Sequence, residues 1–69
     1  MDRAREALLR AEVAAAQTRL QSIKDAWCQL RDVDPSNRNR LEYLAQSIGD
    51  AEDLVRGAER ALHAFLAPA

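Results

Sequence analysis

The chain has few of the residue types on which most catalytic and metal-binding sites depend. It has one cysteine, Cys28, and one histidine, His63, among 69 residues. A lone cysteine excludes a disulfide within the chain and is typical of a reducing compartment, so we expect a cytoplasmic protein. His63 has no second histidine or cysteine at metal-ligand spacing, and no serine lies in a nucleophile motif. The sequence therefore predicts no enzyme, no metal and no cofactor.

Net charge and long apolar runs are also lacking. Ten basic and eleven acidic side chains leave a formal net charge of −1, which excludes a general attraction to phosphate backbones or anionic lipids. The apolar runs are far shorter than the roughly 20 residues that cross a bilayer, and the N-terminus has no apolar signal segment. The sequence thus predicts no membrane partner, and nucleic-acid binding would need a local basic patch.

The residues that are present favour helices. Apolar residues make up 48% of the chain and aromatic residues only 4%, and alanine and leucine, both strong helix formers, dominate the apolar share. The only break in the helical periodicity is the segment 32–36, where Asp34 is predicted as a helix N-cap and Pro35 as the first helical residue. We therefore predict an all-α antiparallel hairpin in a single domain of residues 1–69, with helix 1 at about 2–31, a turn at 32–34 and helix 2 at about 35–66.

Each predicted helix carries an apolar stripe in which the residues recur in steps of three and four, as on one face of a packed helix. Smaller residues form a second line on helix 1, either as a solvated face or as a second packing surface. The predicted core of the hairpin and its dimer comprises Leu9, Val13, Ala16, Leu20 and Ile23 on helix 1, and Leu41, Leu44, Ile48, Ala51, Val55, Leu62 and Phe65 on helix 2.

Two helices in contact along one stripe form a small core. Chains below about 70–80 residues rarely fold on a single core without a further device such as oligomerisation. We therefore predict a homodimer with four helices, either as a bundle or as two hairpins that cross where the small residues Ala16 and Ala51 allow close approach.

Aromatic and arginine side chains gather near the turn, a combination typical of binding hot spots. We predict that the partner-binding residues are Trp27, Arg31, Arg38, Arg40 and Tyr43. One alternative is that Trp27 belongs to the core while the arginines only solubilise the chain. A second alternative is RNA or DNA contact through the three arginines.

The helical arms 4–30 and 41–66, rich in Ala, Arg and Leu, resemble the small phage-encoded antiactivators that bind and inhibit a host quorum-sensing transcription factor. This resemblance implies a homodimeric, non-enzymatic inhibitor in the host cytoplasm, whose target is a DNA-binding regulator. In size and plan the chain also resembles the needle co-chaperones of type III secretion and the RNA-binding four-helix dimer Rop. These two resemblances imply a secretion subunit or paired RNA as the partner.

Overall fold

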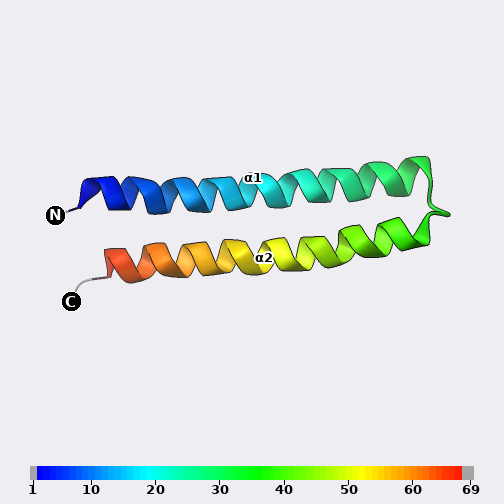
Figure 1. The fold of residues 1–69 in the computed structure, drawn as a ribbon. Helices are drawn as coiled ribbons and strands as arrows, with labels where there is room; N and C mark the ends of the chain where they lie inside the picture. Colours follow the sequence, from blue (N-terminus) through cyan, green and yellow to red (C-terminus); the bar gives the residue numbers. More distant parts are fainter. Residues whose placement is uncertain (1, 68–69) are drawn as a thin grey trace.

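The computed structural model describes residues 2–67 and folds them into two long helices. Helix α1 (Arg3–Val33) and helix α2 (Arg38–Leu66) lie side by side and antiparallel, so the start of α1 and the end of α2 lie at the same end of the molecule (Figure 1). The Cα atoms extend over 53 × 16 × 11 Å. The helical hairpin is confirmed for these residues; residues 1, 68 and 69 of the predicted domain lie outside the described part.

Capping and charge explain where α1 begins. The Asp2 carboxylate accepts a hydrogen bond from the Arg5 backbone N–H at 3.0 Å and serves as the N-cap. Glu6 lies in the first turn, where negative charge suits the helix dipole, and it pairs with Arg10 at 3.2 Å one turn later. These contacts stabilise the start of α1.

The turn differs from the sequence prediction at both helix ends. Helix α1 continues to Val33 because proline excludes only the residue directly before it, Asp34, from the helical region. Asp34 is the C-cap of α1, and its N–H donates to the Leu30 carbonyl at 2.7 Å. The predicted N-cap Asp34 and first helical residue Pro35 are therefore wrong, and α2 does not begin at residue 35.

Asn37 is the residue that caps α2. Its side-chain oxygen accepts from the Arg40 backbone N–H at 3.3 Å, while its own N–H donates to the Asp34 carbonyl at 3.2 Å. Asp34 and Pro35 therefore occupy the first two positions of a tight turn, where these residue types are favoured. The Ser36 hydroxyl donates to the Asp34 carboxylate at 2.7 Å and braces this turn.

Asn37→Ala is expected to lower the free energy of unfolding by about 1 kcal/mol, because the Arg40 N–H loses its acceptor. Asn39→Ala, one residue into the same helix, is the control and is expected to change stability by less than about 0.5 kcal/mol. Urea unfolding followed by circular dichroism measures both. If Asp34→Ala lowers the free energy of unfolding more than Asn37→Ala does, Asp34 rather than Asn37 is the N-cap of α2.

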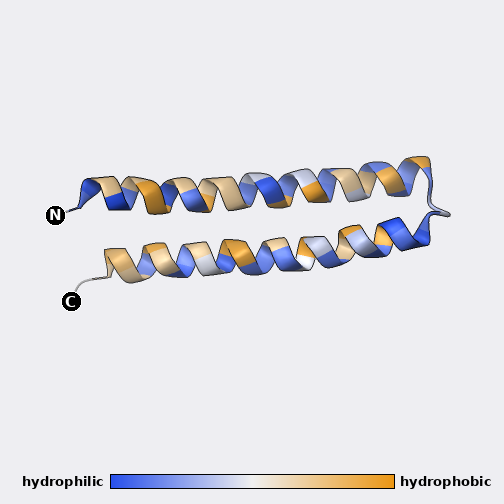
Figure 2. Cartoon of the chain, viewed as in Figure 1, coloured by the Kyte–Doolittle hydropathy of each residue, from blue (hydrophilic) through white to orange (hydrophobic). Residues whose placement is uncertain are grey.

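The contact between the helices is formed by the two apolar stripes. Four side chains are buried, Leu9 on α1 and Leu44, Ala51 and Val55 on α2, and Ala51 is the most enclosed at 3% exposed. The other predicted core residues, which are Val13, Ala16, Leu20, Ile23, Leu41, Ile48, Leu62 and Phe65, are half-buried. Apolar residues recur along both helices between hydrophilic ones rather than in one block (Figure 2). The hairpin thus buries one narrow line of side chains.

Gly49 and Gly57 interrupt α2 away from this contact. A Cβ atom built on either glycine would meet nothing within 4 Å, and neither glycine has a positive φ. No backbone of the hairpin approaches them closely, so neither glycine is required by the packing of α1 on α2.

Candidate functional site

The turn end of α1 carries an aromatic side chain covered by a cation. Trp27 is half-buried, and the guanidinium carbon of Arg31 lies 4.9 Å from the centroid of its ring. The two residues are one helical turn apart, so α1 holds them on the same side. Arg31 also approaches the Asp32 carboxylate, with 3.5 Å between Nε and Oδ1. The result is a pre-organised pair with a planar cation outermost, which suits contact with carboxylates or aromatic rings.

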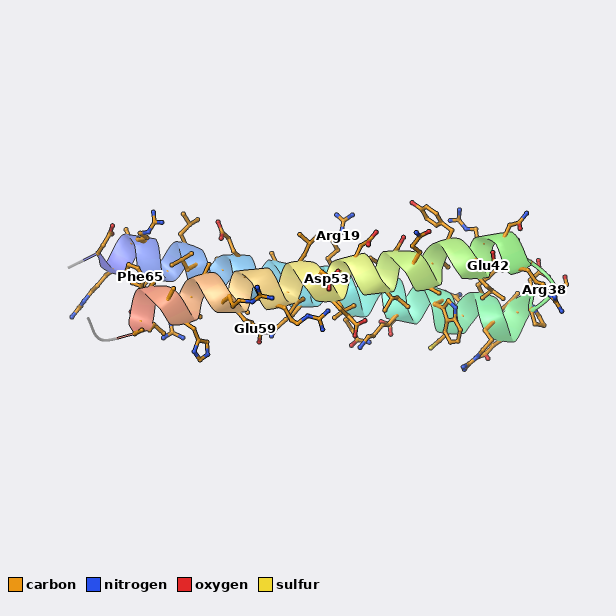
Figure 3. All side chains as sticks on the ribbon, turned by 90° about the horizontal axis from the view of Figure 1, so that it is seen from below. Arg19, Arg38, Glu42, Asp53, Glu59 and Phe65 are labelled. Atoms are coloured by element: carbon orange, nitrogen blue, oxygen red, sulfur yellow. The ribbon has the colours of Figure 1, made fainter. Side chains whose placement is uncertain are left out.

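Arg38 and Arg40 extend this basic character across the turn. Both side chains are exposed, and Arg38 begins α2, whose first turn has no acidic residue. Figure 3 shows Arg38 at the turn end of the hairpin. None of the three ion pairs among the described residues includes Arg38 or Arg40. Positive charge at a helix N-terminus is unfavourable, so a partner's carboxylate would stabilise this end of α2.

Tyr43 does not join the Trp27 and Arg31 pair. It is 63% exposed and lines a groove of about 410 Å³ between the two helices, together with Arg19 of α1 and Leu54 of α2. The structure therefore separates the predicted binding residues into three groups. Trp27 and Arg31 are stacked, Arg38 and Arg40 lie at the turn, and Tyr43 belongs to a separate surface.

This groove escaped the prediction of partner-binding residues. Its walls carry Arg19 from α1 and Asp50 from α2, and its floor includes the buried side chains of Leu44 and Ala51. The signal in the sequence is a second stripe on α2, which runs through Tyr43, Ser47, Asp50 and Leu54 in steps of four, three and four. Ser47 and Asp50 interrupt the apolar pattern, and for that reason the sequence does not indicate a packing surface there.

A smaller apolar hollow lies on α1 near the turn. It has a volume of about 290 Å³ and is lined by Ala26, Gln29, Leu30 and Val33, and Val33 is 77% exposed. Ala26 and Val33 follow Arg19 at intervals of seven residues, so they lie on the same side of α1. Apolar surface therefore continues from the groove to the turn.

The remaining candidate groups stand alone. Cys28 is an exposed free thiol and His63 is exposed in the last turn of α2. Within residues 2–67 no three His, Cys, Asp or Glu side chains lie close enough together to hold a metal ion. Neither described helix contains a stretch apolar enough to cross a membrane.

Comparison with protein-family models, with curated proteins and with solved structures finds no match to this chain.

Proposed function

We propose that the chain is a non-enzymatic, homodimeric inhibitor of the bacterial cytoplasm that binds a host regulatory protein and covers a surface which that protein needs. The observation that carries this proposal is the stacked Trp27 and Arg31 pair near an exposed helix end, at the same end of the hairpin as the arginines that begin α2. Tryptophan and arginine are the residue types most enriched at the centres of protein interfaces. A quorum-sensing transcription factor is the target class that the resemblance to phage antiactivators favours.

The shape of the hairpin supports inhibition by occupancy. Two helices of 31 and 29 residues form a rod that presents preformed side chains, so the chain pays little conformational entropy when it binds. A helical surface of this kind fits an apolar groove or a domain interface on a partner. Covering such a site prevents the partner from contacting its DNA or its own subunits.

The experiment that tests this proposal is an affinity capture from bacterial lysate with the tagged chain, with and without nuclease, followed by direct binding to each purified candidate. The proposal is supported if a transcription regulator is recovered also after nuclease treatment and binds the purified chain directly. Addition of the chain should then release this regulator from its DNA. Binding to a secretion subunit instead, or loss of every partner with nuclease, overturns it in favour of a co-chaperone or an RNA-binding protein. RNA binding would also weaken steeply with added salt.

A further inference from the structure

One long side of the hairpin exposes large apolar side chains to solvent, between a few charged residues. We call it the groove face and define it by four residues of each helix that flank the groove or follow it at helical spacing: Leu8, Ala15, Arg19 and Ala26 on α1, and Tyr43, Asp50, Leu54 and Ala61 on α2. Its three large apolar side chains are well exposed, with Leu8 at 57%, Tyr43 at 63% and Leu54 at 61%. A surface of this kind marks an interaction site.

The ion pairs of the hairpin lie elsewhere. The three ion pairs join Glu6 to Arg10, Arg31 to Asp32 and Asp53 to Arg56, and none of these six residues belongs to the groove face. Figure 3 shows Arg19 at the opposite edge of the rod from Glu59. Among its eight residues Arg19 and Asp50 are the charged ones, and Glu12 and Arg40 lie at its borders, seven residues before the groove residues Arg19 and Ser47. Neither Arg19 nor Asp50 forms an ion pair within the described residues.

The exposed area is large for a single chain of this size. The hairpin exposes 5470 Å², whereas a compact monomer of 7.7 kDa exposes about 4,300 Å². A standard interface removes about 800 Å² from each partner. Burial of one long side against a second copy would therefore remove most of the excess exposed area.

The residues of the groove face complement one another in size and charge. Arg19 and Asp50 line the same groove, and we take them as one level of the antiparallel pair, so that residues equally far from them along the two helices are level with each other. In this register Leu8 is level with Ala61. Likewise, Ala15 is level with Leu54 and Ala26 with Tyr43. Each level thus pairs a large side chain with a small one, and one level pairs opposite charges.

We propose that the groove face binds a second copy of this chain, with both turns at the same end, so that α1 of each copy lies over α2 of the other. This inference rests on the proposed homodimer and names its surface. The arrangement places Arg19 of each copy against Asp50 of the other, and each exposed large side chain against an alanine. A two-fold interface must be self-complementary, and a central pair of opposite charges sets its register.

The test mixes two charge-reversal variants. Arg19→Asp gives the groove face two acidic residues, and Asp50→Arg gives it two basic ones, so each variant alone should dimerise about tenfold or more weakly than the natural chain, because like charges then meet. An equimolar mixture restores opposite charges at both contacts and should consist mainly of heterodimer. Native mass spectrometry resolves the three dimers by mass. Charge effects within one chain cannot produce this preference.

Arg10→Asp and Glu59→Arg form the matched control. Arg10 and Glu59 are level with each other in the same register, and both lie outside the groove face. In their equimolar mixture the heterodimer should make up about half of all dimers, which is the fraction expected for random pairing. If the Arg19→Asp and Asp50→Arg mixture forms dimers with no excess of heterodimer, or if only the control mixture shows such an excess, the groove face is not the dimer interface. The proposed homodimer itself would not be affected by that result. A natural chain that stays monomeric at micromolar concentration in light scattering overturns both.

Disulfide formation tests the relative direction of the two copies. In a Cys28→Ser background, Ala15→Cys is mixed with Leu54→Cys and exposed to air. The proposed arrangement puts residue 15 of one copy against residue 54 of the other, so the mixed disulfide should form well beyond the statistical half. Predominant disulfides between identical variants would place α1 over α1 or α2 over α2 and overturn the proposed arrangement.

Discussion

Ala51→Leu is expected to destabilise the hairpin by about 1–3 kcal/mol, the cost of forcing extra methyl and methylene groups into a packed contact. Ala51 is the most enclosed side chain, at 3% exposed, and it lies on the floor of the groove beside Leu44. A larger residue there pushes α1 and α2 apart along much of their length. For a chain of this size, about 1 kcal/mol lowers the melting temperature by roughly 4–8 °C.

Thermal unfolding followed by circular dichroism at one fixed protein concentration measures this effect, since dimerisation makes the melting temperature depend on concentration. Ala45→Leu is the control, because Ala45 is exposed on the same helix and leucine is nearly as good a helix former as alanine. Equal melting temperatures for the two variants would show that the helices do not meet at Ala51.

Arg31→Ala is expected to weaken binding to the regulatory partner by about 30-fold, which corresponds to a loss of about 2 kcal/mol at an interface hot spot. The guanidinium group covers the Trp27 ring at 4.9 Å, and its removal takes away both a planar cation and the order of the indole beneath it. Arg31→Lys should recover only part of the affinity, because an ammonium group cannot stack or donate in a fork. Titration calorimetry against the purified partner measures the three affinities.

Arg56→Ala is the matched control for Arg31→Ala. Arg56 is exposed and pairs with Asp53, as Arg31 pairs with Asp32, but it has no aromatic partner and lies far from the turn. Exposed ion pairs contribute about 0–1 kcal/mol, so both variants should melt close to the natural chain. If both variants bind the partner equally well, or if Arg31→Ala unfolds the hairpin, the turn end is not the binding site.

Several features of the fold could be predicted because they depend on contacts within a few residues. The spacing of Leu9, Val55 and their neighbours at three and four residues requires helices, and both residues are buried in the structure. The start of α1 is likewise local, because Asp2 caps a backbone N–H only three residues away.

The connection between the helices could be predicted only in part. Asp34 and Asn37 are both suitable N-cap residues, and propensity alone does not choose between them. The choice depends on how the chain reverses: a tight turn from Asp34 to Asn37 satisfies the Asn37 N–H and leaves the Asn37 side chain to cap α2. Such a reversal is a property of both helices together.

The candidate site shows the same division. Composition and periodicity alone required two amphipathic helices, a turn near Pro35 and arginines beside it, because each follows from local propensity and the helical repeat. The stacking of Arg31 on Trp27 is also local, because the two residues lie one turn apart on α1. Only the packing of α2 on α1 determined that Tyr43 joins Arg19 and Asp50 in a groove. The helical repeat determines where each side chain lies around the axis of its helix. The rotation of one helix relative to the other is set by the close packing of side chains such as Ala51 and Leu44 between them.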